Sequence, residues 1–236
     1  MSVLDRIERL RNVMEQQKID CYIIPTDDYH HSEYVGDYFK FREYITGFTG
    51  SAGTAVFTKD KAGLWTDGRY FIQAEAQLQG SGITLYKSGE PGVPTIEEFL
   101  KSELKEGDVL GFDGRTVTYA QGKRYCHIAD ENGASLQYRL DFAQNIWKER
   151  PEMSLEPVFS LADEYTGEKI GSKLERIREI MKENGCNAHV LSSLDDIAWL
   201  LNIRGNDIAY CPLVLSYAIV YNNSVELFAD IRKFSD

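Results

Sequence analysis

The sequence predicts an α/β protein in which a mixed β-sheet is built twice. Short apolar runs typical of strands alternate with amphipathic segments typical of helices, a pattern that places helices on the faces of a sheet. Residues 54–57 and 63–66 flank a polar turn and predict a β-hairpin, so the sheet is mixed and not purely parallel. Residues 216–234 align without a gap on residues 53–71 at a constant offset of 163 residues. This internal repeat indicates two copies of one fold.

The first copy is expected to alternate helices and strands from its start. Apolar residues at helical spacing between Val3 and Met14 predict an amphipathic first helix. The apolar run Cys21–Ile24, ended by Pro25, predicts a buried strand. A polar and aromatic loop then leads through a short helix to the glycine-rich turn 47–53. The remaining pattern predicts a helix after Asp67, strands near 83–86, 109–112 and 136–139, and helices across 95–104 and 119–130.

The chain is expected to divide into a first domain over residues 1–146, a linker over residues 147–158, and a second, homologous domain over residues 159–236. The linker carries two prolines and several charged residues. We expect the second copy to be truncated, because the first copy continues over residues 72–146 after its last matched position.

The repeat is also visible before the hairpin. The segment 174–185 repeats 4–15 in phase, Ala188–Leu191 repeats the first strand, and Asp195-Asp196 repeats Asp27-Asp28.

The composition excludes several classes of protein. A hydrophobic content of 43% is typical of a globular chain, and the formal net charge of −11 argues against a nucleic-acid partner or an anionic membrane partner. No apolar run reaches the roughly 18 residues of a membrane span, and the charged N-terminus lacks the apolar core of a signal peptide. Four widely spaced cysteines fit reduced thiols. These features predict a cytoplasmic protein.

Metal chemistry has weak support in this sequence. Asp27, Asp28 and Asp67 could gather at strand ends around Mg²⁺, but the recurrence of these aspartates in the second copy favours helix caps and turns. His30 and His31 are adjacent, and neighbouring side chains of an extended segment point in opposite directions. We therefore expect no metal site and no catalytic residue in this chain.

Arg69 is the candidate binding residue. It follows Asp67 and Gly68 at the end of a strand, where it is expected to begin a helix, and a glycine before it lets a ligand or another backbone approach closely. The structural alternative is an ion pair between Arg69 and Asp67, which Arg232 would repeat in the second copy.

Several long motifs resemble the cytosolic Xaa-Pro aminopeptidases, also called aminopeptidase P. They include P-T-x-D-x-H-x-S-E-Y (Pro25 to Tyr34), F-x-G-S-A-G-T-A (Phe48 to Ala55) and W-T-D-G-R-Y-F (Trp65 to Phe71), and further matches continue through L-D-D-I-A-W-L-L-N-I-R-G (Leu194 to Gly205). The resemblance covers essentially the whole chain. It implies two creatinase/prolidase N-terminal-type domains, each with a ribonuclease H-like motif, which in this family precede a C-terminal catalytic domain.

The resemblance carries implications for function. The family removes the N-terminal residue from peptides with proline second, using two divalent metal ions (Mn or Zn) held by two Asp, one His and two Glu of the catalytic domain. That ligand motif is absent from this sequence, so the chain resembles the non-catalytic arm. By this resemblance Arg69 contacts the peptide substrate, Arg232 is structural, and the enzyme is a homodimer. A scaffold module that has lost peptidase chemistry is the alternative.

Overall fold

The computed structural model describes residues 1–234, which divide after Pro151 into two compact units. None of the helices within residues 1–234 is long and apolar enough to cross a membrane.

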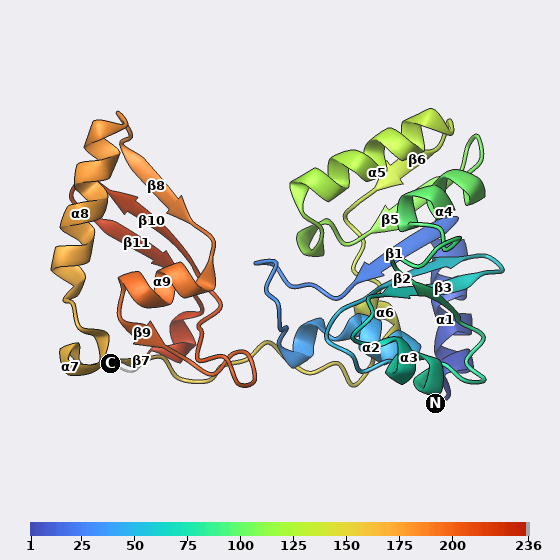
Figure 1. Ribbon diagram of the computed structural model, residues 1–236, viewed down its shortest axis with the longest axis horizontal. Helices are drawn as coiled ribbons and strands as arrows, with labels where there is room; N and C mark the ends of the chain where they lie inside the picture. The colour runs from blue at the N-terminus through green and yellow to red at the C-terminus, as the bar shows by residue number, and fades with distance from the viewer. Residues whose placement is uncertain (235–236) are drawn as a thin grey trace. The chain divides into compact units, whose positions relative to one another are not determined.

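The first unit contains a six-stranded sheet in the order β4-β3-β2-β1-β5-β6 (Figure 1). Its strands are β1 Cys21–Pro25, β2 Thr54–Thr58, β3 Ala62–Thr66, β4 Thr84–Lys87, β5 Val109–Phe112 and β6 Ser135–Gln137. The pairs β1–β2 and β2–β3 are antiparallel, whereas β1–β5, β5–β6 and β3–β4 are parallel. The mixed sheet predicted from the hairpin is confirmed.

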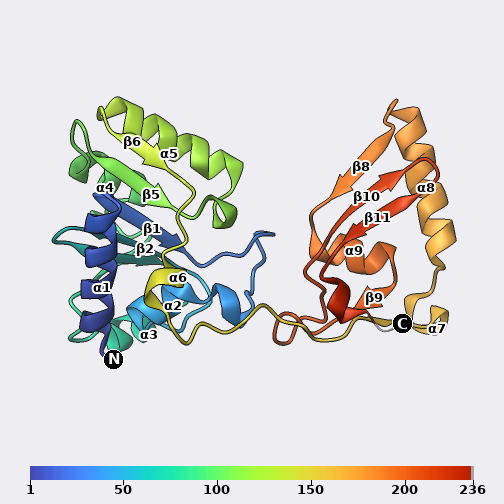
Figure 2. The same cartoon turned by 180° about the vertical axis from the view of Figure 1, so that it is seen from behind.

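Helices cover both faces of this sheet, and Figures 1 and 2 show the same two groups from opposite sides. One face carries α1 Val3–Gln16, α2 Phe41–Thr46, α3 Phe71–Gln77 and α6 Ala143–Ile146, and the other carries α4 Ile96–Glu103 and α5 Tyr119–Glu131. Because side chains alternate along each strand, every strand contributes residues to the hydrophobic cores on both faces of the sheet. In β1, Tyr22 and Ile24 pack under the first group, while Cys21 and Ile23 pack under α4 and α5.

Local sequence decides where the longer helices of this unit begin. Ser2 caps α1, Thr95 caps α4 and Thr118 caps α5, and in each case the residue three positions later returns a hydrogen bond to the cap. A short 3-10 helix, η1 Asp37–Phe39, precedes α2, and another, η2 Gly114–Thr116, follows β5.

The predicted linker begins in a segment that packs on the first unit. The Trp147 ring stacks on the Tyr44 ring at a centroid distance of 4.7 Å. Arg150 donates from Nη1 to Asp141 at 2.9 Å and from Nε to the Tyr38 carbonyl at 2.9 Å. These contacts hold residues 147–150 against the first unit, up to the division after Pro151.

The second unit contains a three-stranded sheet in the order β11-β10-β8 and a separate two-stranded ribbon of β7 and β9. Its strands are β7 Phe159–Ser160, β8 Ala188–Leu191, β9 Ile203–Arg204, β10 Tyr217–Tyr221 and β11 Val225–Phe228. Its helices are α7 Asp163–Thr166, α8 Ile170–Glu183, α9 Leu194–Leu200 and the 3-10 helix η3 Ile231–Lys233. Residues of α8 and α9 pack on one face of the β11-β10-β8 sheet.

The two hairpins share one register, which confirms the internal repeat. Tyr217 lies opposite Phe228 as Thr54 lies opposite Trp65, and the next three pairs also agree at the offset of 163 residues. The strand pairing of β8 with β10 likewise repeats that of β1 with β2. The β11-β10-β8 sheet therefore corresponds to β3-β2-β1.

One predicted correspondence between the copies is wrong. Asp195 and Asp196 lie exposed in the first turn of α9, whereas Asp27 and Asp28 are buried in the loop after β1. In the second unit Ser193 caps α9 close to the end of β8. In the first unit a longer loop separates β1 from α2, the helix that contacts β1 and β2 as α9 contacts β8 and β10.

The second face of the β11-β10-β8 sheet differs from its counterpart. Val190 is 66% exposed where the matched Ile23 is 1% exposed, and Phe228 is 50% exposed where the matched Trp65 is 4% exposed. In the first unit α4 and α5 cover this face. The same strand pattern thus ends in a covered face in one unit and an apolar exposed face in the other.

Candidate functional site

The candidate residues of the first unit lie at one edge of its sheet. Strands β1 and β3 run in the same direction because each is antiparallel to β2, and β5 is parallel to β1. Their carboxyl ends therefore meet at one edge. That edge carries the loop after β1, the Asp67–Arg69 turn after β3 and the Asp113–Arg115 turn after β5. In open α/β sheets this edge is where ligands bind.

Arg69 lies in a turn and not, as predicted, at the start of a helix. The turn closes through the Tyr70 N–H, which donates to the Asp67 carbonyl at 3.0 Å, and α3 begins only at Phe71. Asp67 competes for the local backbone here: its Oδ1 accepts the Arg69 N–H at 3.1 Å, the kind of local bond that favours a turn over a helix.

The Arg69 side chain folds back onto the same aspartate. Its Nε donates to Oδ1 of Asp67 at 2.9 Å and its Nη2 donates to Oδ2 at 2.9 Å. The Arg69 side chain is still 62% exposed. These hydrogen bonds from Arg69 lower the pKa of Asp67, and the same pairing raises the pKa of Arg69. The turn therefore presents a charged pair with zero net charge to solvent.

Gly68 has no packing reason to be a glycine. A Cβ atom at this position would meet a Phe71 ring carbon at 3.8 Å, an ordinary contact. Gly114, by contrast, is required sterically, because its Cβ would lie 2.8 Å from the Tyr138 carbonyl oxygen. The fold of the first unit explains Gly114 and leaves Gly68 without an internal cause.

Neighbouring loops hold the Arg69 turn in place. The Tyr70 hydroxyl lies 2.6 Å from Ser51 Oγ, and the Thr66 hydroxyl donates to the Ala52 carbonyl at 2.7 Å. Buried Arg42 fixes this glycine-rich loop from below by donating to the carbonyls of Phe48 and Gly50. Burial lowers the pKa of Arg42 to about 10, so the side chain stays cationic at neutral pH. The glycine-rich segment 47–53 is therefore a turn, as predicted, and these hydrogen bonds hold it in place.

The same aspartate–arginine arrangement occurs twice more within residues 1–234. Arg115 donates from Nε and Nη2 to Asp113 at 3.0 and 2.8 Å, and Arg232 donates from Nε and Nη2 to Asp230 at 3.0 and 2.6 Å. Arg232 was matched to Arg69 by the repeat, whereas Arg115 was not predicted from the sequence. The signal was available, because Asp113-Gly114-Arg115 repeats the Asp-Gly-Arg triplet directly after a strand.

Arg115 differs from the other two in its further partners. Its Nη2 also donates to Asp141 at 2.9 Å, and its guanidinium lies 4.9 Å from the centre of the Tyr29 ring. Asp141 in turn accepts from Arg150. Arg115 therefore belongs to an ion-pair chain that ties the ends of β5 and β6 to residues 147–150, a structural role.

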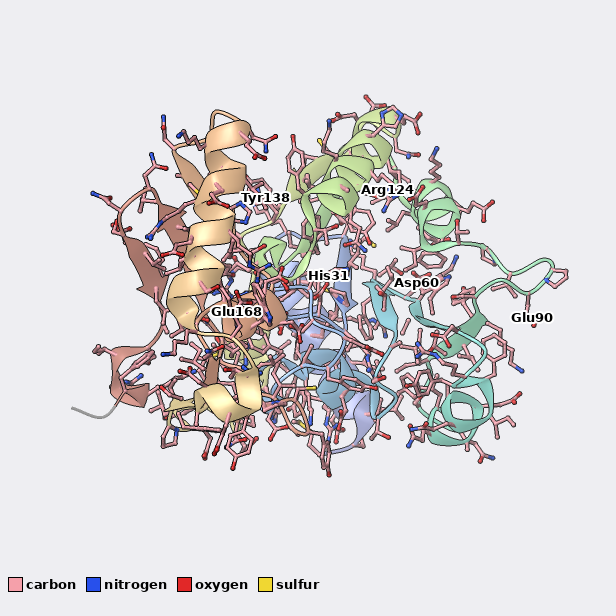
Figure 3. The ribbon with its side chains drawn as sticks, turned by 60° about the vertical axis from the view of Figure 1, so that its left-hand side comes forward. His31, Asp60, Glu90, Arg124, Tyr138 and Glu168 are labelled. Carbon is pink, nitrogen blue, oxygen red and sulfur yellow. The ribbon has the colours of Figure 1, made fainter. Side chains whose placement is uncertain are left out.

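The loop after β1 is organised by two buried aspartates. Asp27 Oδ2 lies 2.6 Å from His31 Nδ1, and Asp28 Oδ1 accepts the backbone N–H groups of His30 and Ser32. Burial raises the pKa of Asp27, and the hydrogen bond from His31 opposes that shift. Figure 3 labels His31 on this loop. These bonds make the aspartates turn-forming residues.

Residues 1–234 do not offer the ligands of a dinuclear metal centre. Across residues 1–234 no group of three or more His, Cys, Asp or Glu side chains is arranged to hold a metal ion. Asp27 uses both carboxylate oxygens on the loop itself, and Asp28 uses Oδ1 there while its Oδ2 is buried without a hydrogen-bond partner. Asp67 uses its carboxylate on Arg69. The aspartates at this end of the sheet are therefore assigned to turns and ion pairs.

The family of this fold is shown by sequence. The creatinase/prolidase N-terminal domain family matches residues 6–137, and a second family of the same description matches residues 149–236. The chain belongs to the creatinase/prolidase N-terminal domain family and carries two such domains.

The individual relatives are more specific. Xaa-Pro aminopeptidase 1 of Dictyostelium discoideum is 38% identical over 245 residues, and Aminopeptidase P1 of Arabidopsis thaliana is 38% identical over 233 residues. The alignments cover 100% and 98% of this chain but only 39% and 36% of those proteins. The chain thus spans well under half the length of the curated relatives it matches.

A solved structure of an X-prolyl aminopeptidase also matches the whole of this chain. The X-prolyl aminopeptidase of Caenorhabditis elegans, described as a cytosolic enzyme with a di-nuclear active site, matches with a TM-score of 0.92 and 36% identity. The match covers 100% of this chain and 40% of that structure.

Proposed function

We propose that this chain is the non-catalytic N-terminal arm of a metal-dependent Xaa-Pro aminopeptidase that removes the N-terminal residue from peptides with proline second. The observation that carries the proposal is the similarity of the whole chain to part of the C. elegans enzyme. Two divalent metal ions, Mn or Zn, would belong to a part of the enzyme outside this chain, since residues 1–234 offer no group to hold them.

The arm would shape access to the cleft where peptides are cleaved. An enzyme that removes one residue at a time has to exclude folded proteins, and a wall beside the cleft does this by steric exclusion. Arg69 is the residue proposed to face the peptide. Its exposed guanidinium lies at the carboxyl edge of the sheet, beside a glycine for which the fold gives no other reason. A cytoplasmic homodimer is the proposed setting.

The proposal is tested on the protein expressed from the complete coding region. Release of the first residue is measured for a peptide with proline second and for a matched peptide with alanine second. We expect cleavage of the proline peptide only, lost with a chelator and restored by manganese. This chain alone, with manganese, is the matched control and is expected to release no residue.

Two outcomes would contradict the proposal. Cleavage by this chain alone that survives removal and return of metal would place the chemistry in the arm. Inactivity of the complete protein, together with a coding region that lacks two Asp, one His and two Glu in ligand positions, would instead support the scaffold alternative.

A further inference from the structure

A cavity of about 440 Å³ lies on the side of the first unit that α4 and α5 cover. Its lining comes from the end of β3, the loop 88–94 after β4, the start of α4 and the first half of α5. Figure 3 labels Glu90 on that loop and Arg124 on α5. The volume falls within the roughly 300–1,000 Å³ that is typical of small-molecule sites. No residue of the Asp67–Arg69 turn lines the cavity, which is therefore a separate candidate site.

The inner part of the cavity is apolar. Trp65 is 4% exposed, and it lines the cavity together with Val93, Pro94 and Ile96. The indole N–H of Trp65 already donates to the Pro94 carbonyl at 2.8 Å, so the ring offers contact area and no free donor. This part of the cavity suits an apolar group, because contact there removes apolar surface from water.

Tyr125 brings an unused hydroxyl to the same cavity. The residue is only 8% exposed, yet its hydroxyl has no hydrogen-bond partner among residues 1–234. The hydroxyl is not one of the fully buried atoms without a partner, so it still reaches solvent. Burial raises the pKa of Tyr125 to about 12, Glu97 adds to that shift and Arg124 opposes it. The hydroxyl is therefore neutral at pH 7 and lies near two charged residues that also line the cavity. Because buried polar groups are normally hydrogen-bonded, it is available to a ligand.

Glu97 and Arg124 form a charged pair at the opening of the cavity. Their side chains are 48% and 60% exposed, and Arg124 Nε lies 3.4 Å from Glu97 Oε1. This separation is longer than the roughly 2.7–2.9 Å of a charge-assisted hydrogen bond. Within residues 1–234 neither side chain makes a hydrogen bond to another residue, so the N–H groups of Arg124 and the carboxylate oxygens of Glu97 remain available.

We propose that this cavity binds a free amino acid with an apolar side chain. The ammonium and the carboxylate of an amino acid are attached to one carbon, so they lie side by side as Glu97 and Arg124 do. Arg124 binds the carboxylate through two parallel N–H groups, Glu97 accepts the ammonium, and the Tyr125 hydroxyl donates to the carboxylate. The apolar side chain packs against Trp65 and Val93. A ligand with a single charge would bond to one member of the pair and meet like charge from the other.

Binding at this cavity is independent of the proposed function and is tested on this chain. Isothermal titration calorimetry measures the affinity for L-leucine and for two analogues, isocaproate, which lacks the ammonium, and isoamylamine, which lacks the carboxylate. We expect L-leucine to bind, and each analogue to bind about 10-fold more weakly because it loses one charge-assisted hydrogen bond. L-Leucine should also shift the NMR resonances of the Gly89 N–H and the Gln121 side-chain amide, since both residues line the cavity.

Variants at the opening identify which residue binds which charged group. Glu97→Gln should weaken the binding of L-leucine about 10-fold without weakening that of isocaproate, and Arg124→Gln should do so without weakening that of isoamylamine. Both side chains are exposed, so both variants should fold. Tyr125→Phe removes only the hydroxyl and should weaken L-leucine by about 2- to 5-fold.

Glu131→Gln is the matched control. Glu131 pairs with Lys101 at 2.9 Å between the same two helices, and neither residue lines the cavity, so this variant should bind L-leucine as the wild type does. Equal affinities of the wild type for L-leucine, isocaproate and isoamylamine would overturn the proposal, because the cavity would then recognise only the apolar group. An unchanged affinity for L-leucine in both Glu97→Gln and Arg124→Gln, or no binding of L-leucine at millimolar concentration, would also overturn it.

Discussion

The three Asp-x-Arg turns show how one local interaction serves different ends. In each turn the aspartate at the end of a strand accepts the N–H and the guanidinium of the residue two positions later. The arrangement needs only neighbouring residues and is therefore independent of tertiary contacts. What distinguishes the arginines is their surroundings. Arg115 meets a second carboxylate, Arg232 follows Ile231, and Arg69 follows a glycine whose position could hold a Cβ in ordinary contact.

The first prediction at this scale concerns Arg69. On the proposed function, Arg69→Ala in the protein from the complete coding region is expected to lower kcat/KM on a peptide with proline second by about 10- to 100-fold, or roughly 1.4–2.7 kcal/mol for a lost charge-assisted contact. The melting temperature should change by only a few degrees, because exposed ion pairs contribute little to stability.

Arg232→Ala is the matched control, since it removes the equivalent arginine–aspartate hydrogen bonds from the second unit. It should leave kcat/KM unchanged. Equal kcat/KM for Arg69→Ala and the wild type at subsaturating substrate would make Arg69 a residue of the fold alone.

The second prediction concerns the titration of Asp230. Hydrogen bonds from Arg232 lower the pKa of Asp230 from 3.8 to about 2. A lowered native pKa means that the unfolded chain binds more protons, so the small stabilisation from this pair is present above pH 3.8 and is lost as the pH falls towards 2. NMR titration of the Asp230 carboxyl carbon should show the low pKa in the wild type. In Arg232→Ala the pKa of Asp230 should return towards 3.8. If it stays low in that variant, the hydrogen bonds from Arg232 are not the cause of the low pKa.

At the scale of elements, the two matched hairpins show that an identical strand register does not produce the same burial of side chains. The β2–β3 and β10–β11 hairpins have the same pairing, yet Trp65 is 4% exposed and Phe228 is 50% exposed. Trp65 stacks on Tyr86 at 4.1 Å and donates its indole N–H to the Pro94 carbonyl at 2.8 Å. Equivalent positions of one repeat therefore carry unequal shares of the packing energy.

The third prediction follows from this difference. Trp65→Ala should destabilise the first unit by about 3–5 kcal/mol, as expected for a large aromatic removed from a core. Phe228→Ala should change the stability of the second unit by less than about 1 kcal/mol, because its ring is half exposed. Native-state hydrogen exchange of the amides in each hairpin measures the two effects separately. Equal losses would show that Phe228 is covered in solution.

At the scale of the whole molecule, the second unit presents an apolar sheet face and two strand edges. Val190 and Phe228 are exposed on that face, and β8 and β11 form the edges of the sheet. In the first unit the corresponding face is covered by α4 and α5, and β5 and β4 pair with the corresponding strands. Exposed edges and apolar faces favour association.

The fourth prediction is that this chain self-associates as its concentration rises. Sedimentation velocity should show a concentration-dependent increase in mass, and the double variant Val190→Glu with Phe228→Glu should reduce it, because like charges would then meet at the contact. Ile72→Glu, which changes an exposed residue of the first unit, is the control. A monodisperse monomer of the wild-type chain at high concentration would contradict the prediction.

Most elements of the first unit could be predicted because their signals are local. Helical spacing and capping boxes define α1, α4 and α5, and alternating or continuous apolar runs define the strands. The start of α3 could not be predicted from spacing, because Asp67 takes the Arg69 N–H and delays the helix to Phe71. The pairing of Asp195 and Asp196 with Asp27 and Asp28 failed for a different reason, because Ser193 caps a helix at that point of the second unit.

The sequence by itself determined the α/β class, the repeat at an offset of 163 residues and the shared hairpin register. These features depend on residues that are near one another in the chain or in the hairpin, so the sequence pattern is enough to predict them. Only the tertiary structure decided which strand face is covered and that Arg115 has a second carboxylate partner in Asp141. Burial and ion pairing join segments that are far apart in the sequence. Which of these segments meet depends on how the chain folds around the sheet, and no local sequence pattern encodes that.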